Sequence, residues 1–197
     1  METYGTTQEK IIPLSEVELD KNYAVIITSN AGLWRYKIGD TVRFTSLSPY
    51  RVRVTGRTKH HINAFGEELI IENAEEAIKK AAIQTNCAIV EYSAAPIFMD
   101  GKGKGAHEWI IEFKKKPEHI EEFRQLLDKN LQNINSDYEA KRHNNMTLKL
   151  LKLNVAQPNL FHEWLRQNNK LGGQHKIPRL SNKRDYLEEL LAINKRL

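Results

Sequence analysis

The sequence predicts an α+β fold, in which a β-rich N-terminal segment is followed by a small domain of helices packed on a mixed sheet. Three observations support this prediction. Residues 11–57 contain short apolar runs separated by turn residues, a pattern typical of strands. From residue 73, apolar residues recur at helical spacing, and such stretches then alternate with strand-like runs. Hydrophobic residues make up 40% of the chain and charged residues 28%, as in ordinary globular domains.

The β-rich segment contains predicted strands separated by turns. Val52 and Val54 alternate with arginines at the period of two that a half-buried strand has. Turns are predicted at Asn30-Ala31-Gly32 and at Ser48-Pro49. The predicted strands cover residues 23–28, 33–37, 41–45 and 51–55.

The second part begins with a helix, because apolar residues from Ala74 to Ala82 share one face and Asn73 with Glu76 resembles a capping box. The apolar runs at 88–93 and 108–113 predict two paired strands, with a flexible hairpin turn at residues 101–105, GKGKG. This glycine-rich turn does not match a phosphate-binding P-loop, since it lacks Gly-Lys-Ser/Thr and does not precede a helix.

The remaining elements complete the small domain. A long amphipathic helix is predicted with Pro117 in its first turn. It is followed by a strand over 147–153, a helix over about 159–169, and a last helix after Ser181. We place the β-rich part at residues 1–57 and the second domain at 58–197, with a hinge near 57–60.

Composition limits the class of protein. No apolar run approaches the roughly 20 residues that a membrane helix needs, so we expect no membrane partner. The single cysteine, Cys87, leaves no internal disulfide and is typical of a reducing compartment, so we expect a cytoplasmic protein. The net charge of +5 suggests an anionic partner, although 25 acidic residues are scattered among the basic ones.

Residues 32–40, GLWRYKIGD, contain the first candidate site residue. A carboxylate held after a glycine at a strand end, as Asp40 is, can accept two hydrogen bonds from a ribose diol, a role that acidic residues have in dinucleotide folds. The alternative is a turn aspartate that caps its own backbone. Trp34 and Tyr36 are predicted to pack and hold the strand, with Arg35 and Lys37 on the opposite face.

Residues 56–69, GRTKHHINAFGEEL, contain a second group of candidates. Arg57 is a permanent hydrogen-bond donor, and Lys59 stands next to two histidines; the alternative is a basic loop between domains. We expect no metal site at His60-His61, because neighbouring side chains on a strand point to opposite faces.

Residues 172–179, GGQHKIPR, predict a mobile cationic loop between helices. Such a loop can bring the Lys176 ammonium to a phosphate or carboxylate, whereas the alternative is a solvent-exposed linker.

The order of these motifs resembles the adenylate-forming superfamily. The residues of the motifs are most similar to those of the auxin-responsive acyl-acid amido synthetases, the Gretchen Hagen family. We expect a bacterial member of that family. GLWRYKIGD resembles that branch's Gly-Leu-Tyr-Arg-Tyr-Arg-x-Gly-Asp signature, and QHKIPR resembles its Gln-x-Lys-x-Pro-Arg. The resemblance runs from about residue 11 to 193.

The resemblance implies that an acid and ATP form an acyl-adenylate and pyrophosphate, and that an amine then displaces AMP. It implies that Asp40 holds the ribose hydroxyls, with Arg57 and Tyr36 in the same nucleotide site. Lys59 would lie at the hinge, and Lys176 would be the catalytic lysine that reaches the carboxylate and the α-phosphate. ATP and Mg²⁺ are the implied cofactors.

Two departures qualify the resemblance. The superfamily's Ser/Thr/Gly-rich phosphate loop and its acyl pocket are not found in this sequence, and the hinge wording KHHINAFGEEL differs from that of plant members. We therefore expect the C-terminal portion of a longer ligase, inactive alone, whose partners are an N-terminal adenylation domain and small carboxylic acid and amine substrates.

A competing hypothesis is a stand-alone basic α+β module that binds RNA or another polyanion, motivated by the net charge. Against it, the aromatic residues Trp34, Tyr92, Trp109 and Phe113 lie in apolar strand patterns instead of on an exposed stacking face.

Overall fold

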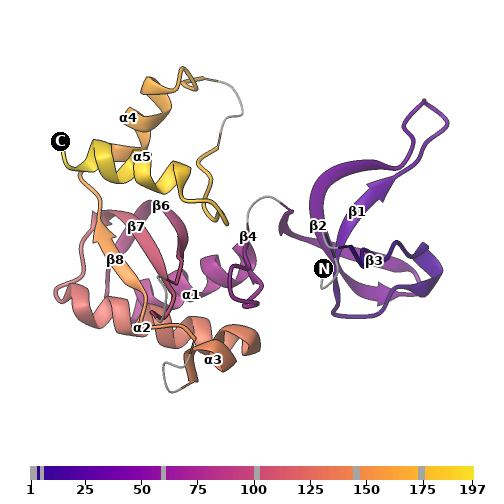
Figure 1. Ribbon diagram of the computed structural model, residues 1–197, viewed down its shortest axis with the longest axis horizontal. Helices are drawn as coiled ribbons and strands as arrows, with labels where there is room; N and C mark the ends of the chain where they lie inside the picture. Colours follow the sequence, from indigo (N-terminus) through magenta and orange to yellow (C-terminus); the bar gives the residue numbers. More distant parts are fainter. Residues whose placement is uncertain (1–3, 5–6, 59–60, 100–102, 144–146, 173–175) are drawn as a thin grey trace. The chain divides into compact units, whose positions relative to one another are not determined.

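The structure is a computed structural model that describes residues 4, 7–58, 61–99, 103–143, 147–172 and 176–197 (Figure 1). The chain forms two compact units, residues 1–59 and residues 60–197. Helices and a mixed sheet are both present, which confirms the predicted α+β class.

Unit 1 is an antiparallel sheet in the order β1-β2-β3, formed by β1 (Asn22–Ile27), β2 (Tyr36–Leu47) and β3 (Tyr50–Arg57). A short 3₁₀ helix, η1 (Leu14–Glu16), precedes it. Its buried apolar side chains are Val42 and Phe44, and the ring of Phe44 meets Tyr23 and Tyr50 edge-on at centroid distances of 5.9 and 6.1 Å. Strand β2 replaces the two separate strands predicted at 33–37 and 41–45.

Unit 2 contains a three-stranded mixed sheet between two helical layers (Figure 1). Its strands are β6 (Ala88–Ile97), β7 (Ala106–Lys115) and β8 (Lys152–Val155), with β7 antiparallel to β6 and parallel to β8. One face carries α1 (Ile71–Gln84) and α2 (Ile120–Ile134), and the other carries α4 (Leu160–Gln167) and α5 (Asp185–Asn194).

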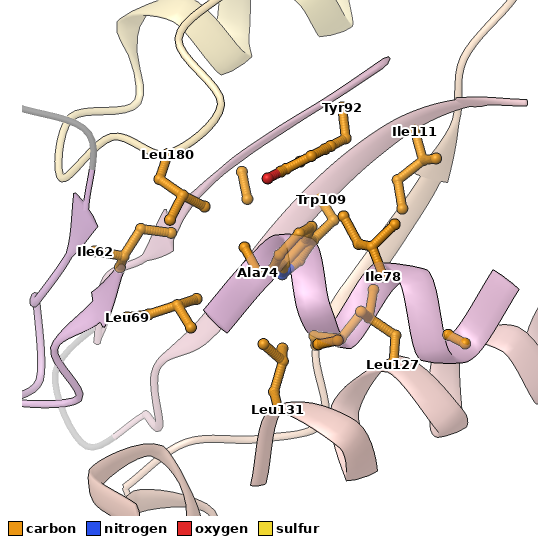
Figure 2. Close-up of a cluster of buried hydrophobic side chains, with 14 of the residues drawn as sticks. Ile62, Leu69, Ala74, Ile78, Tyr92, Trp109, Ile111, Leu127, Leu131 and Leu180 are labelled. Carbon is orange, nitrogen blue, oxygen red and sulfur yellow. The ribbon is translucent and has the colours of Figure 1, made fainter. Parts of the chain in front are cut away.

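The central strand β7 is buried on both faces, which explains its continuous apolar run. Trp109 and Ile111 pack with α1 and α2 in the larger core (Figure 2), whereas Ile110 packs with α4 and α5 in the smaller one. All three side chains have 0% of their surface exposed. Both hydrophobic core clusters among the described residues therefore belong to unit 2.

A two-stranded hairpin opens unit 2, made of β4 (His61–Ile62) and β5 (Leu69–Ile70). Ile62 and Leu69 are fully buried in the larger core (Figure 2). At the turn, the ring of Phe65 lies so close to Gly105 that a Cβ on that glycine would stand 2.2 Å from the ring's Cζ. The hairpin is thus docked against β7 at its turn and in the core at its strands.

The helix starts differ from the prediction. Helix α1 begins at Ile71, and Asn73 lies at its third position, where the side chain accepts the N–H of Ile70 at 3.4 Å. The predicted Asn73 cap was therefore wrong. Helix α2 begins at Ile120, so Pro117 precedes the helix and does not lie in its first turn.

Helix α3 (Ser136–Arg142) was not predicted. Asn135 caps it by accepting the N–H of Tyr138 at 2.7 Å. The signal was present in the sequence, because an asparagine directly before a polar, acidic turn is a common helix start.

The strand predicted at 147–153 is shorter and later, since β8 covers only Lys152–Val155. Leu148 and Leu151 are both fully buried, a spacing of three that a regular strand does not place on one face. Arginine side chains, not a neighbouring strand, take up the carbonyls of these residues: Arg142 bonds to Leu148 at 2.9 Å, and Arg124 to Leu151 at 3.2 Å. In the described part of the chain, no helix is long and apolar enough to cross a membrane.

Candidate functional site

Asp40 lies in a bulge of β2. Between the pairs Ala24–Thr41 and Ile26–Lys37, β2 contains three residues where β1 contains one. Gly39, in the middle of these three, has φ +87°, a left-handed conformation that glycine adopts without penalty. Asp40 is therefore inside a long strand, and its predicted place at a strand end was wrong. Bulges re-aim side chains and are frequent next to functional sites.

The structure pairs Asp40 with Arg57 across the β2–β3 ladder. The next residue, Thr58, is also bonded to the bulge, because its N–H and its hydroxyl both donate to the carbonyl of Gly39, at 2.8 and 3.3 Å. Asp40 is half-buried. Two predicted nucleotide residues thus occupy facing backbone positions, while the predicted hinge residue, Lys59, lies outside the described residues.

Trp34 and Tyr36 are exposed, with 80% and 51% of their surfaces open. The prediction that they pack to hold the strand was wrong, because the buried apolar side chains of unit 1, Val42 and Phe44, lie further along β2. Tyr36 begins β2, opposite Ile27. Lys37 forms an ion pair with Glu9 at 2.8 Å, and this hydrogen bond raises the pKa of the lysine.

The argument against nucleic-acid binding assumed that Trp34 lies in an apolar strand pattern and not on an exposed face. Its exposure weakens that argument. Two of the other aromatic residues, Tyr92 and Trp109, are buried as expected, at 4% and 0% exposure. Their rings stack on each other inside the larger core.

Lys176 is an exposed lysine at the start of a fixed segment of unit 2. We call residues 177–184 the strap. Ser93 of β6 donates its hydroxyl to the carbonyl of Pro178 at 2.7 Å, and the N–H of Ala94 donates to the carbonyl of Arg179 at 2.8 Å. The strap therefore continues the sheet at the edge of β6, and the mobile loop predicted for 172–179 is anchored directly after Lys176. Residues 173–175 of that loop lie outside the described residues.

The other cation of this motif, Arg179, serves the fold. Its guanidinium pairs with Glu91 at 2.7 Å and with Glu75 at 2.6 Å, and it lies 5.4 Å from the ring centre of Tyr92. The hydrogen bond to Glu91 is the main reason that the pKa of Arg179 is raised. This side chain holds the strap on the sheet, which leaves Lys176 as the motif's candidate for ligand chemistry.

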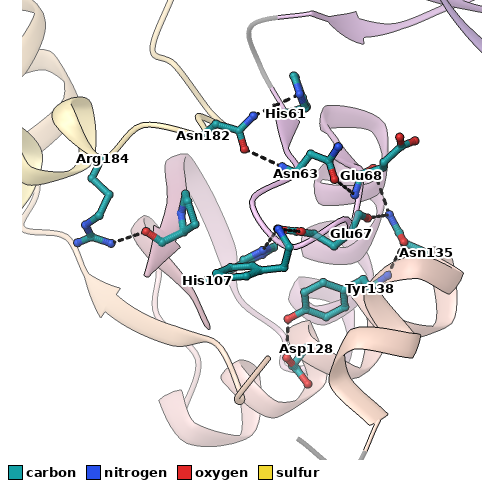
Figure 3. A network of polar contacts seen from close by, with 12 residues as sticks. His61, Asn63, Glu67, Glu68, His107, Asp128, Asn135, Tyr138, Asn182 and Arg184 are labelled. Atoms are coloured by element: carbon teal, nitrogen blue, oxygen red, sulfur yellow. Dashed lines mark hydrogen bonds and ion pairs between the residues drawn. The ribbon is translucent and has the colours of Figure 1, made fainter. Parts of the chain in front are cut away.

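Sequence reasoning missed a buried polar pair that docks the β4–β5 hairpin (Figure 3). His107 of β7 lies with its Nε2 atom 2.8 Å from Glu67, and neither side chain has any exposed surface. Glu67 also accepts the N–H of Phe65 at 2.7 Å. Burial raises the pKa of the Glu67 carboxyl, but the hydrogen bond and charge interaction with His107 and the backbone hydrogen bonds together outweigh it, so the pKa lies below its usual value. A histidine inside the apolar run AHEWII was the available signal.

A second polar cluster, made of Asp128, Tyr138 and Arg142, lies beside the first pair. Asp128 of α2 accepts the hydroxyl of Tyr138 at 2.7 Å and three hydrogen bonds from Arg142 at 2.9–3.0 Å. Burial raises the pKa of Tyr138 well above its usual value. The ring of Tyr138 also lies 5.3 Å from that of His107, so α3 closes over the docked hairpin.

No group of three or more metal-binding side chains gathers among the residues that the structure describes. His61 faces Asn182, with 3.3 Å between its Nε2 atom and the amide nitrogen, and His60 lies outside the described residues.

Comparison with known proteins decides the family. The sequence matches the GH3 family C-terminal domain over residues 72–185 and the GH3 family central domain over residues 1–57. The chain belongs to the GH3 family.

Curated GH3 relatives cover most of this chain. A jasmonoyl-L-amino acid synthetase, JAR6 of Nicotiana attenuata, is 26% identical over 193 residues, which are 93% of this chain and 33% of the relative. The rice jasmonoyl-L-amino acid synthetase GH3.5 is 29% identical over 87% of this chain and 30% of its own length. The indole-3-acetic acid-amido synthetase GH3.3 of Arabidopsis thaliana is 21% identical over 88% of this chain and 31% of its own length. This GH3 chain thus spans about a third of the relatives it matches.

A solved structure supports the fold. The GH3.15 acyl acid amido synthetase matches with a TM-score of 0.68 at 20% identity, over 94% of this chain and 35% of that structure. The same synthetase in complex with 2,4-DB matches with a TM-score of 0.65 at 19% identity, over 92% of this chain and 34% of that structure. The fold of this GH3 chain is therefore shared with an acyl acid amido synthetase.

Proposed function

We propose that this chain works as the C-terminal portion of an ATP-dependent acyl-acid amido synthetase and is inactive alone. The observation that carries the proposal is the bulge of β2, which puts Asp40 opposite the backbone of Arg57 in the part that matches the GH3 central domain. The relatives' names support the reaction class, since they describe an indole-3-acetic acid-amido synthetase and a jasmonoyl-L-amino acid synthetase. An N-terminal adenylation domain is the proposed partner, and the cytoplasm is the proposed compartment.

The proposed reaction has two steps. A carboxylate oxygen of the acid attacks the α-phosphorus of ATP, and the bond to pyrophosphate breaks. An amine then attacks the carbonyl carbon of the acyl-adenylate, loses a proton and releases AMP. The acid and the amine are small molecules whose pockets we assign to the partner domain.

Each candidate residue has a proposed role in this reaction. Asp40 accepts hydrogen bonds from the ribose hydroxyls, and Arg57 and Tyr36 contact the same nucleotide. Lys59 is the hinge about which unit 2 reorients. Lys176 brings its ammonium to the α-phosphate, where negative charge develops as the pentavalent phosphorus forms.

ATP would bring Mg²⁺ on its phosphates, as nucleotide enzymes usually hold this ion with few protein ligands. Among the residues that the structure describes, no three or more carboxylate, histidine or cysteine side chains come together that could hold a metal ion. We therefore assign no residue of this chain to magnesium.

The test is adenylation by the complete synthetase, with the N-terminal domain on the same polypeptide or supplied in trans. We expect Asp40→Ala to lower kcat/KM for ATP by about 10- to 100-fold, the effect of losing hydrogen bonds to a charged group. We expect Lys176→Ala to lower kcat by on the order of 100-fold, because its contact is made in the transition state. ATP–pyrophosphate exchange measures both effects.

Matched controls separate these roles from loss of fold. Asp137→Ala and Lys129→Ala remove exposed charges of the same type elsewhere, and both variants should adenylate like the wild type. Undiminished exchange in both Asp40→Ala and Lys176→Ala would refute the assigned roles.

A further inference from the structure

One side chain joins two segments of unit 2 that are far apart in the sequence (Figure 3). Asn182, in the strap, accepts the N–H of Asn63 at 2.7 Å. The amide nitrogen of Asn182 lies 3.3 Å from Nε2 of His61. Because an amide NH₂ group only donates, this contact is a hydrogen bond in the tautomer of His61 whose Nε2 is unprotonated. Asn182 thus uses both ends of its amide on the segment of residues 61–63, at β4 and directly after it, across a separation of 119 to 121 residues.

These contacts are held in register by the core. Between His61 and Asn63, the side chain of Ile62 is fully buried, and Leu180 of the strap is fully buried in the same cluster. A lateral shift of either segment would therefore pull an apolar side chain out of its place. The amide of Asn182 therefore adds hydrogen bonds between the hairpin and the strap, whose apolar side chains Ile62 and Leu180 already pack in one core cluster.

The strap is anchored on both sides of Asn182. Before it, the N–H of Ser181 donates to the carbonyl of Ala94 at 3.1 Å. After it, Arg184 donates to the carbonyl of Pro96 at 2.9 Å and pairs with Glu108 at 2.7 Å. Lys176 stands at the start of this anchored segment, so its backbone follows the position of the strap.

The hairpin is likewise anchored at both ends. Glu67 and His107 fix its turn on β7, and Asn182 fixes its first strand, which begins directly after the division between the two units. The first residues of unit 2 and the segment that begins at Lys176 are thereby parts of one hydrogen-bonded body.

We propose that Asn182 is a positioning residue for Lys176, which ties the strap to the hairpin that follows the hinge. Any rotation at residues 57–60 then moves the hairpin and Lys176 together. This inference rests on the proposed function of Lys176 in adenylation.

The first experiment needs no activity. In the 197-residue chain, hydrogen exchange is followed by NMR for Asn182→Ala and for the control Asn168→Ala, whose amide donates to the carbonyl of Trp164, four residues earlier, at 3.0 Å. We expect exchange of the Asn63 amide, and of amides in the strap, to accelerate by about tenfold or more in Asn182→Ala alone. Asn182→Asp, which keeps the acceptor oxygen, should retain protection at Asn63. Wild-type protection at Asn63 in Asn182→Ala would overturn the proposal.

The second experiment tests the link to catalysis in the complete synthetase. We expect Asn182→Ala to lower kcat of ATP–pyrophosphate exchange by on the order of 10- to 100-fold, since small displacements of a reacting group are that costly. KM for ATP should stay within about twofold, and the transfer of acyl groups from supplied acyl-adenylate to the amine should be retained. A merely structural role would lower both half-reactions together, and that result would overturn the proposal.

The two inferences fail separately. A wild-type synthetase without pyrophosphate exchange would refute the proposed function, while the tie between hairpin and strap would still be decided by hydrogen exchange. If Lys176→Ala loses adenylation but Asn182→Ala keeps the wild-type kcat, the positioning role is refuted and the proposed function stands.

Discussion

At the scale of single residues, Gly39 explains how Asp40 is presented. Its φ of +87° is a left-handed conformation, whereas the space around it is open: a Cβ would meet only the hydroxyl of Thr58, at 3.8 Å. The glycine is thus required by the backbone of the bulge and not by crowding. A side chain at this position would favour a regular strand, and a regular strand would aim the next residue differently.

We expect Gly39→Ala to destabilise unit 1 by about 1–2 kcal/mol, the cost of a left-handed alanine. It should also raise KM for ATP in the complete synthetase, because the bulge that aims Asp40 is strained. Urea unfolding and ATP–pyrophosphate exchange measure the two effects.

Gly32 provides the matched control, since it has φ +96° and no atom within 4 Å of its Cβ position. Gly32→Ala should cost similar stability and leave KM for ATP unchanged. Equal rises in KM for both variants would show that strain alone, and not the aim of Asp40, is responsible.

At the scale of elements, the Glu67–His107 pair decides how the β4–β5 hairpin docks on β7. His107 Nδ1 is buried without a hydrogen-bond partner among the described residues. An ionised carboxylate only accepts hydrogen bonds, so Nε2 of His107 is the donor to an ionised Glu67. The buried carboxylate then receives two donors, the imidazole and the N–H of Phe65.

This pair makes the stability of unit 2 depend on pH. The folded pKa of Glu67 lies below its usual value of 4.5, so the unfolded chain binds the proton more readily. The stabilisation is therefore present above about pH 4.5 and is lost as pH falls through the folded pKa. Glu67→Gln should remove that acid dependence and cost about 1–3 kcal/mol at pH 7.

Urea unfolding at a series of pH values measures the effect of Glu67→Gln. Glu139→Gln, which replaces an exposed carboxylate on α3, should change stability by less than about 0.5 kcal/mol. A wild-type pH profile in Glu67→Gln would contradict an ionised, buried Glu67.

At the scale of the whole molecule, the two units differ in how many apolar side chains they bury. Both hydrophobic clusters lie in unit 2, while the most buried apolar side chains of unit 1 are Val42 and Phe44, at 9% and 6% exposure. Several large apolar side chains of unit 1 are exposed, among them Trp34, Val52 and Val54. A domain of this size with so little buried surface is marginally stable.

We expect unit 1 to open before unit 2. Amides of β2 should exchange with a free energy of opening at least about 2 kcal/mol lower than those of β7, because local stability follows buried contacts. Hydrogen exchange by NMR in dilute urea measures both. One shared free energy of opening for β2 and β7 would contradict separate stability.

Most features that depend on residues close together in the sequence were predicted, whereas features that depend on contacts between distant residues were not. Strand β7 was predicted because burial on both faces leaves a continuous apolar run, and α2 because its apolar side chains recur at helical spacing. Both signals are local, since they follow from the periods of the backbone itself. Helix α3 carried a local signal at Asn135 that was not used. The packing predicted for Trp34 failed because exposure depends on which residues cover a position.

The sequence by itself determined the α+β class, the elements with strong periodicity, and the order of the Asp40, Arg57 and Lys176 motifs. Only the tertiary structure decided that Asp40 lies in a bulge opposite Arg57, that Glu67 meets His107, and that Asn182 ties the strap to the hairpin. The last contact spans 119 to 121 residues. This contact forms only when the elements between the hairpin and the strap have folded, and the local periodicity of the sequence does not encode such a long-range arrangement.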